Sequence, residues 1–398
     1  MIRFGPAGIP LSCKGRTLRD GIADVHHLGL AALEAQFIKV NPLQRVALEE
    51  EVGKRPRDLV QQLAIAVGAT ALDAAEPTLG TLTAPIKKHD TVTTLTTSLA
   101  KDYADLQTTR ALARSLDVEL MLHAPYYVDF FGSSEARVRS TRQIQWAGVL
   151  AEGLGARYLV THLGFYGPAS REASFDAMAR ILGELSRWLT TYTHGGTRLA
   201  IEPSGHPDVF GSRQEILALS RKVRGIVPVL NVPHIMARER IPLEKPEDYA
   251  PLVEEFRSAS GGTLYLNFSG VEYFGPGVMR LTPVKRGMIR FDPLAELLTE
   301  RDYDATVISS SPLLEHDAMS MKLLYERALT RRWMRKHAPP SPARPAARVP
   351  PAAKPPATRP APPRGRARTT RPSHPTAKAK AHPRPRTRSH KAGHGRSH

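Results

Sequence analysis

The feature that most constrains the fold is a regular alternation of short apolar segments and helical patterns. After residue 101, each segment rich in Leu, Ile, Val and Ala is followed by a stretch with apolar residues at three- and four-residue steps. This repeat predicts strands joined by helices, because parallel strands need long crossover connections. Most intervals from one strand to the next run about 28 to 42 residues, the length of one β-α unit. The sequence therefore predicts a parallel α/β sheet.

The predicted elements extend over residues 1–337. The predicted strands are residues 2–5, 32–38, 118–122, 158–163, 198–202, 226–231, 263–268 and 305–309. The predicted helices are residues 17–29, 103–116, 134–154, 174–189, 213–222, 246–256, 293–298 and 317–336. Open doubly wound sheets use the same alternation. Eight units with polar residues at most strand ends favour a closed (β/α)8 TIM barrel.

An insertion of about residues 45–98 interrupts the repeat after the second strand. Leu48–Val67 contains a helical pattern that breaks at Pro56, and Thr78–Thr97 is rich in Thr and Leu without clean periodicity. We therefore expect mixed structure in this segment. Because it follows a strand at the end where a barrel has its mouth, we also hypothesise that it covers or reshapes a substrate groove.

Residues 338–398 differ in kind from the rest of the chain. They contain 15 of the 56 Lys and Arg residues, 15 prolines, no aromatic residue and no acidic residue. The remaining residues carry 41 basic and 38 acidic residues, so most of the net charge of +18 lies in this tail. Ordering such a segment would cost ~1–2 kcal/mol per residue without apolar burial to offset it. We therefore predict a disordered basic tail.

A tail of Pro, Ala, Lys and Arg is typical of an electrostatic contact with nucleic acid. The alternative is a solubilising or merely tolerated extension. We predict DNA as the partner, bound by the tail and by two basic residues near the barrel mouth. The predicted DNA-contacting residues are Lys285, Arg286, Arg364, Arg366, Arg368, Lys378, Lys380, Arg384, Arg386 and Arg388.

The remaining composition narrows the class of protein. Cys13 is the single cysteine, which excludes an intrachain disulfide and a multi-cysteine zinc finger. No apolar run approaches the ~18 residues of a membrane span. The first residues, MIRFGPAGIP, lack the basic and apolar regions of a signal peptide. We therefore expect a cytoplasmic, nucleoid-associated monomer that has no membrane contact.

Polar residues that bind metals end four successive predicted strands. They are His123, His162, Glu202 and His234. Any one strand-end histidine is more often a satisfied structural residue, but barrel geometry would bring all four around one mouth. Imidazole nitrogens and a carboxylate are the ligands that catalytic zinc favours. The sequence therefore predicts a metal site with these four residues as ligands and Glu202 as the catalytic residue.

Several motifs, spread in order over residues 1–326, carry a resemblance to a known family. They are FGPAGIPLS (Phe4–Ser12), LHAPYY (Leu122–Tyr127), THLGFY (Thr161–Tyr166), IEPSGHPDVFGS (Ile201–Ser212), FSGVEY (Phe268–Tyr273) and SSPLLEHDAMSMK (Ser310–Lys322). With them the chain resembles the endonuclease IV family of apurinic/apyrimidinic endonucleases, within the xylose-isomerase-like barrels. It is most similar to the archaeal-type members. The insertion and the tail lie outside the resemblance.

The resemblance implies a specific metal chemistry. In that family, three zinc ions at the barrel mouth cleave the DNA backbone on the 5′ side of an abasic sugar. His123, His162 and Glu202 match the ligands of the first, more exposed zinc, and the glutamate matches the bridging ligand. His234 matches a ligand of the third zinc.

The chain departs from that pattern at four positions. Asn231 stands where the family has Asp, Tyr265 and Leu281 where it has His, and Ser310 where it has Glu. Asn and Ser are weak neutral ligands and Leu is none, so tight binding of a second and third ion is not expected. Two histidines and one glutamate with an open position remain a reasonable hydrolytic zinc site, so we predict one Zn²⁺ rather than three.

Three functions fit these residues. The first is a metal-dependent phosphodiesterase that acts on abasic or otherwise damaged DNA in DNA repair, with a reduced metal site. The second is a DNA-binding TIM barrel whose catalytic centre has decayed, which the replaced ligands favour. The third is an isomerase or epimerase of a sugar or sugar phosphate. The basic tail argues against the third function, because an enzyme needs no segment with 15 positive charges to bind a small substrate.

Overall fold

The computed structural model describes residues 1–337, apart from 39, 169 and 276–277. At its centre lie two parallel sheets. The first contains, in spatial order, β1 (Ile2–Pro6), β14 (Asp304–Ser309), β11 (Thr263–Phe268) and β10 (Leu230–Asn231). The second contains β2 (Ala32–Gln36), β6 (Glu119–His123), β7 (Tyr158–Thr161), β8 (Arg198–Ile201) and β9 (Ile226–Pro228).

The two sheets meet at both of their edges. Next to β2, the amide of Ala31 donates to the carbonyl of Phe4 in β1 at 3.0 Å. At the other edge, β9 continues through Val229 into β10, and the amide of Val229 donates to Ile201 in β8 at 2.9 Å. This arrangement is the predicted parallel TIM barrel. The predicted strand at 226–231 is thus divided between the two sheets.

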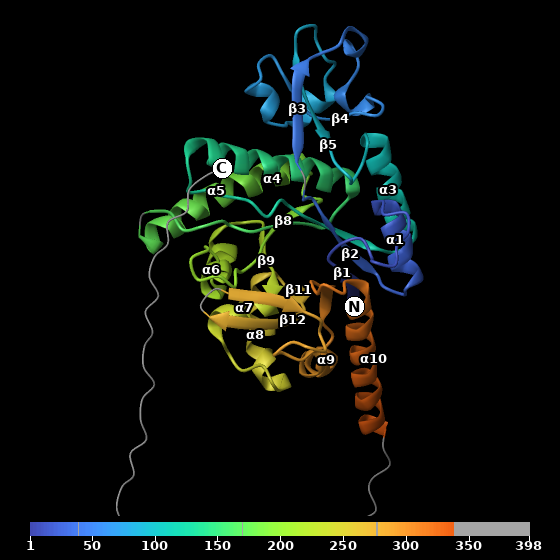
Figure 1. Ribbon diagram of the computed structural model, residues 1–398, viewed down its shortest axis with the longest axis vertical. Coiled ribbons are helices and arrows are strands. Elements are labelled where there is room, and N and C mark those ends of the chain that lie inside the picture. Colours follow the sequence, from blue (N-terminus) through green and yellow to red (C-terminus); the bar gives the residue numbers. More distant parts are fainter. Residues whose placement is uncertain (39, 169, 276–277, 338–398) are drawn as a thin grey trace, which may run out of the picture. The chain divides into compact units, whose positions relative to one another are not determined.

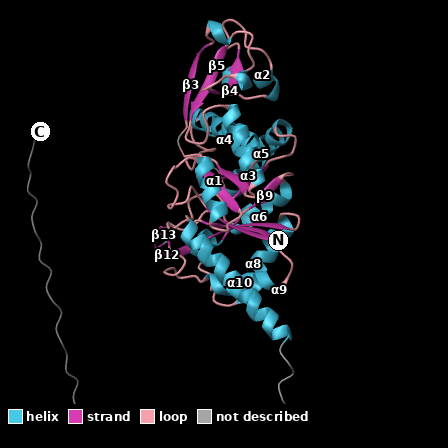
Figure 2. Cartoon of the chain, turned by 90° about the vertical axis from the view of Figure 1, so that its right-hand side faces the viewer, coloured by secondary structure: helices cyan, strands magenta, loops and turns pink. Residues whose placement is uncertain are grey.

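Helices cover the outside of the strands (Figures 1 and 2). They are α1 (Leu18–His27), α3 (Tyr103–Ser115), α4 (Ser134–Leu154), α5 (Arg171–Tyr192), α6 (Arg213–Lys222), α7 (Val232–Glu239), α8 (Pro246–Ala259), α9 (Phe291–Glu300) and α10 (Glu315–His337). Serines cap three of them: the side chains of Ser133, Ser170 and Ser212 each accept from the amide three residues later. Such caps satisfy amides that the first helical turn leaves unpaired.

The alternation of strand residues explains the position of the polar site. One apolar cluster fills the barrel interior and contains Ala32, Met121, Tyr158, Val160, Ala200, Val227, Val229, Tyr265 and Ile308. Residues two positions further along a strand face the same side. On that side Met121 is followed by His123, Ala200 by Glu202 and Val229 by Asn231. A polar layer therefore closes the apolar interior at the carboxyl ends of the strands.

The inserted segment forms a small antiparallel sheet and not the helix that its first half predicts. Its strands are β3 (Asn41–Val46), β5 (Thr91–Thr96) and β4 (Leu63–Gly68), in that spatial order, and its short helical pieces are η1 (Glu49–Glu51), η2 (Pro56–Asp58), η3 (Asp73–Ala75) and α2 (Leu79–Thr83). The predicted helical pattern over Leu48–Val67 is wrong. Pro56 begins a single 3-10 turn, and the apolar run after it is the buried strand β4.

The inserted sheet packs on the outer helices α3, α4 and α5 (Figure 1). The indole N–H groups of Trp146 and Trp188 donate to the carbonyls of Ala75 and Pro77 at 3.3 and 3.0 Å. Arg57 reaches both Glu152 and Tyr192, at 3.2 and 3.0 Å. These anchors lie along the helical flank, so they give no support to the hypothesis that the insertion covers the mouth.

Outside the inserted segment, the sequence patterns missed a two-stranded hairpin and one helix. One is a hairpin of β12 (Gly270–Gly275) and β13 (Val278–Thr282), and the other is α7, which begins directly after Asn231. The tail, with all its predicted DNA-contacting residues from Arg364 to Arg388, lies outside the described residues. No helix in the described part of the chain is both long and apolar enough to cross a membrane.

Candidate metal centre

The structure brings His123, His162 and Glu202 together at the mouth of the barrel. One ligand atom from each lies within 4.8 Å of the other two. The same carboxylate oxygen, Oε1 of Glu202, is 3.0 Å from Nε2 of His123 and 3.0 Å from Nε2 of His162. His123 ends β6, whereas His162 and Glu202 directly follow β7 and β8. Neighbouring parallel strands thus deliver three donor atoms to one point.

The ring of His123 is oriented by the backbone carbonyl of the next residue, Ala124. Nδ1 lies 2.7 Å from the carbonyl oxygen of Ala124, which makes Nδ1 a donor and directs Nε2 towards Glu202. Burial disfavours a charged ring, but the hydrogen bond to Glu202 and the charges of Glu202 and Glu34 outweigh it and raise the pKa of His123 to about 9. A metal ion that binds Nε2 must therefore displace a proton.

The other two side chains are already in the ionisation state that a metal needs. Burial, together with the charges of His123 and His234, lowers the pKa of His162 to about 4 against the attraction of Glu202. Burial also opposes ionisation of Glu202, but the surrounding histidines hold the pKa of this carboxyl well below its usual range. Near neutral pH the pair therefore offers a neutral imidazole and a carboxylate.

His234 lies beside this cluster but is not one of its three members. Its ring stacks near that of His162, with centroids 6.3 Å apart and an interplanar angle of 18°. Its Nδ1 accepts a hydrogen bond from the amide of Gly205 at 3.2 Å. Burial lowers its pKa, so the ring is neutral and is held by the backbone of the loop after β8.

Asn231 occupies the remaining side of the carboxylate. Its Nδ2 donates to Oε2 of Glu202 at 2.8 Å, and its Oδ1 accepts from the amide of His234 at 3.3 Å, where it caps α7. Asn231 and Glu202 are both buried. Because an amide N–H group faces Oε2, only Oε1 of Glu202 is directed towards the two histidines.

A second polar layer, which the sequence patterns did not reveal as part of the site, lies next to His123. The hydroxyl of Tyr265 donates to Oε2 of Glu34, and Nε2 of Gln36 donates to Oε1 of the same carboxylate at 2.8 Å. The hydroxyl of Tyr126 donates to Oε1 of Gln36 at 2.7 Å, and its ring stacks on His123 at 4.6 Å between centroids. Burial raises the pKa of Glu34, against the opposing charge of His123 and the hydroxyl of Tyr265.

The other two replaced positions carry no acidic or imidazole group. Leu281 lies in β13, opposite Val271 of the hairpin. Ser310 follows β14, and its Oγ is buried without a hydrogen-bond partner among the described residues. A weak signal for the second layer does exist in the sequence, because Glu34 and Gln36 alternate along an otherwise apolar strand.

Replacing Tyr265 by phenylalanine is expected to lower the free energy of unfolding by about 1–3 kcal/mol, since one oxygen of the buried Glu34 loses its partner. Urea unfolding at neutral pH measures the change. Tyr158→Phe is the matched control. Tyr158 is also buried and packs on Tyr265 at 5.2 Å, but its hydroxyl makes no hydrogen bond within the described part of the chain. Equal losses in both variants would contradict the role of the Tyr265 hydroxyl.

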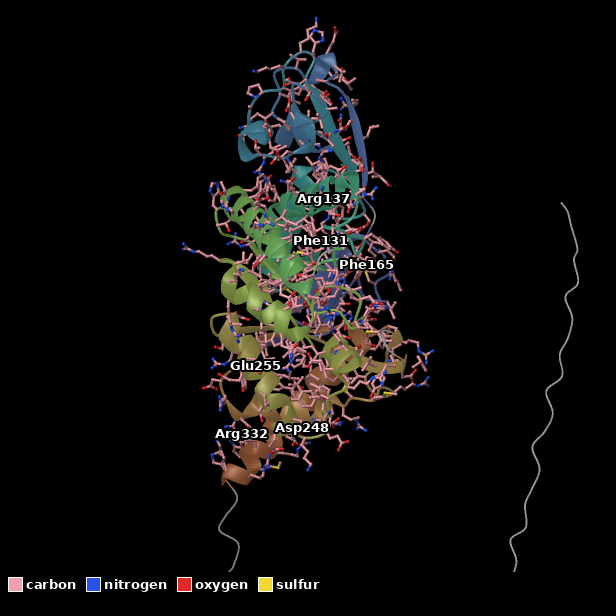
Figure 3. All side chains as sticks on the ribbon, turned by 90° about the vertical axis from the view of Figure 1, so that its left-hand side faces the viewer. Phe131, Arg137, Phe165, Asp248, Glu255 and Arg332 are labelled. Atoms are coloured by element: carbon pink, nitrogen blue, oxygen red, sulfur yellow. The ribbon has the colours of Figure 1, made fainter. Side chains whose placement is uncertain are left out.

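Lys285 and Arg286 are exposed on the loop that follows β13. Neither side chain forms an ion pair with a described residue. Exposed apolar side chains also project near the mouth. Phe165, in the loop after β7 and labelled in Figure 3, is 58% exposed, and Tyr127, in the loop after β6, is 88% exposed.

The chain is similar in sequence or in structure to several known proteins. An uncharacterized protein of Methanocaldococcus jannaschii is 26% identical over 216 residues, which cover 52% of this chain and 77% of that protein. The crystal structure of endonuclease IV from Thermus thermophilus superposes with a TM-score of 0.52 at 16% identity, over 83% of this chain and 99% of the other. An L-ribulose 3-epimerase gives a TM-score of 0.49 at 14% identity, over 86% and 100% of the two chains.

The family comparison is more specific than these individual likenesses. A family model described as a xylose isomerase-like TIM barrel matches residues 85–327, which include every member of the metal cluster. The match confirms the kind of barrel that the sequence motifs indicate. The chain therefore belongs to the xylose isomerase-like TIM barrel family.

Proposed function

We propose that this protein is a phosphodiester hydrolase that acts on damaged DNA with one divalent metal ion, which we propose to be zinc. The observation that carries the proposal is the convergence of Nε2 of His123, Nε2 of His162 and Oε1 of Glu202. Two imidazoles and one carboxylate are the protein ligands of a known class of hydrolytic zinc site. The donor set present in the chain thus fits the ion.

A zinc ion held by these residues would supply Lewis-acid chemistry for hydrolysis of a phosphodiester. The protein's own groups fix the geometry of the site. Asn231 holds Oε2 of Glu202, so that Oε1 stays directed at the two histidines. The ring of Tyr126 covers His123 on one side, and Gln36 holds the Tyr126 hydroxyl in place. The ligands are therefore ordered before an ion arrives.

DNA is the proposed substrate because of three features that support one another. The motifs resemble those of endonuclease IV. Lys285 and Arg286 lie near the mouth and form no ion pair with a described residue. The tail carries 15 positive charges and no acidic residue. Cations that contact phosphates give sequence-independent affinity, which suits an enzyme that recognises a lesion.

Deleting residues 338–398 is expected to weaken duplex binding and to flatten its salt dependence. Each phosphate contact that is lost reduces the slope of log K against log salt by ~0.9. Fluorescence anisotropy with a labelled duplex at several salt concentrations measures both quantities. An unchanged slope would dismiss the tail as a DNA contact.

The test of the proposed function is incubation of the purified protein with a duplex that contains one abasic site. Strand cleavage that zinc supports and EDTA abolishes is the expected result, and Glu202→Gln is expected to remove it. An otherwise identical duplex without the lesion is the control. Indifference to both duplexes would overturn the proposal and favour a small sugar substrate.

A second candidate is a DNA-binding barrel without catalysis. The specific observation in its favour is that neutral groups stand where the resembled family has acidic or imidazole ligands: the amide of Asn231 faces Glu202, and the Tyr265 hydroxyl is engaged by Glu34. Binding to the abasic duplex without cleavage at any zinc concentration would favour this candidate.

A further inference from the structure

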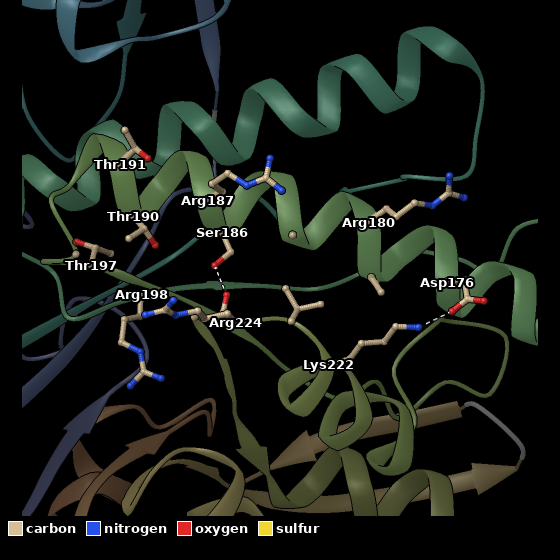
Figure 4. Close-up of a pocket in the computed structure, with 15 residues that line it drawn as sticks. Asp176, Arg180, Ser186, Arg187, Thr190, Thr191, Thr197, Arg198, Lys222 and Arg224 are labelled. Atoms are coloured by element: carbon tan, nitrogen blue, oxygen red, sulfur yellow. Dashed lines mark hydrogen bonds and ion pairs between the residues drawn. The ribbon is translucent and has the colours of Figure 1, made fainter.

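A long groove lies on the outside of the barrel, remote from the metal cluster. It is open to solvent and has a volume of about 950 Å³ between α5 and the segment that joins α6 to β9 (Figure 4). Its first wall is one face of α5, where lining residues recur at three- and four-residue steps from Asp176 to Thr191. Its second wall comprises residues 222–225 and the start of β8 at Thr197 and Arg198.

The groove exists because the two helices differ in length. The ten residues of α6 span ~15 Å, whereas the 22 residues of α5 span ~33 Å, at 1.5 Å per residue. Part of α5 therefore has no helical neighbour on this side. Arg198 opens β8 and Glu202 follows its end, so this wall lies at the opposite end of the strand from the metal ligand.

The charges on the walls are unbalanced. Arg180 and Arg187 lie on α5, and Arg198 and Arg224 belong to the second wall (Figure 4). None of these four arginines forms an ion pair with a described residue, although the charge of Arg180 also acts on the carboxylate of Asp176. The single acidic lining residue, Asp176, is engaged by Lys222 at 2.7 Å. Uncompensated cations around a concave surface create a positive potential that attracts anions.

We propose that this groove binds an organic phosphate of nucleotide size. Guanidinium groups match phosphate oxygens through paired hydrogen bonds, which ammonium groups do not provide. The exposed Thr190 and Thr191 add hydroxyl donors along the same wall. Between the arginines, Ala179, Gly183 and Val223 offer small apolar surface for the uncharged part of the ligand.

The dimensions favour a small molecule over a macromolecule. The volume lies within the ~300–1,000 Å³ range of small-molecule sites. A DNA duplex instead needs a broad surface, with roughly 1,000–2,500 Å² of protein buried.

Isothermal titration of the full-length protein with ATP tests the proposal, with tripolyphosphate and adenosine as separate probes. The double substitution Arg187→Glu and Arg224→Glu is expected to weaken ATP binding at least about tenfold, because two direct phosphate partners become repulsive. Arg221→Glu is the matched control. Arg221 is an exposed arginine of α6 that does not line the groove, so an effect within about twofold is expected there.

Tripolyphosphate is expected to compete with ATP, and adenosine is expected to bind much more weakly. Since the tail is present in every variant, its contribution to ATP binding cancels. The proposal is overturned if ATP does not bind or if the groove and control variants lose affinity for ATP equally. It is also overturned if the groove substitutions weaken the binding of an acidic peptide but of neither ATP nor tripolyphosphate. Thermal unfolding of each variant establishes that the fold is intact.

Discussion

Replacing His162 by alanine is expected to abolish tight binding of the metal ion. The wild-type protein should bind about one zinc per chain, because the described residues contain one group of three convergent ligands. His162 contributes a neutral Nε2 at 3.0 Å from Oε1 of Glu202, and its removal leaves only two ligands. The loss of affinity should exceed the ~10–100-fold that removal of an outer hydrogen-bond partner costs. Competition with a chromophoric chelator measures it.

The same result is expected for His123→Ala, and His27→Ala is the control. His27 is an exposed histidine of α1 that is remote in sequence from the cluster and has no hydrogen bond within the described residues. The chelator also keeps weak binding by the scattered tail histidines out of the measurement. Elemental analysis that found two or three tightly held ions in the wild-type protein would contradict the one-ion site, and unchanged affinity in His162→Ala would remove that residue from it.

Asn231→Asp is expected to convert the site from one ion towards two. An aspartate would keep the oxygen that caps α7 but would place a second carboxylate where Nδ2 now lies, 2.8 Å from Oε2 of Glu202. Without metal, two buried carboxylates at this distance repel each other, and the free energy of unfolding should fall by about 3 kcal/mol or more. Divalent ions should restore stability in proportion to their occupancy.

Asn231→Ala separates the two effects, because it removes the amide without adding charge. It should lose stability from the missing cap and hydrogen bond, but added metal should stabilise it no more than the wild type. The measurement is the melting temperature as a function of zinc or manganese concentration. A metal response of Asn231→Asp that equals that of the wild type would refute the idea that this amide keeps a second ion out.

The barrel and its strand ends could be predicted because local patterns decide them. The helical pattern over Ser134–Leu154 coincides with α4, since Ser133 caps its first turn and Gly155 ends it with a φ of 65°. In the same way, His123 and Glu202 could be placed at strand ends, because a buried strand that closes with a polar residue is visible in a single sequence. The motifs around them then indicated the kind of barrel.

What depends on contacts between distant segments could not be predicted. Glu34 and Tyr265 are 231 positions apart, and only the closed barrel brings their side chains together. A short apolar run such as Leu63–Gly68 fits either a helix or a strand, and here its pairing with Thr91–Thr96 decided the outcome. The groove beside α5 likewise depends on the lengths of two packed helices and leaves no motif.

The attachment of the inserted sheet has a practical consequence for spectroscopy. Of the three indoles in the chain, Trp146 and Trp188 form the seam between that sheet and the helices, whereas Trp333 is 62% exposed. With Trp333 changed to phenylalanine, the tryptophan fluorescence of the protein, excited selectively over that of its tyrosines, would come only from the seam. Its wavelength would then distinguish release of the small sheet from melting of the whole barrel, without any attached dye.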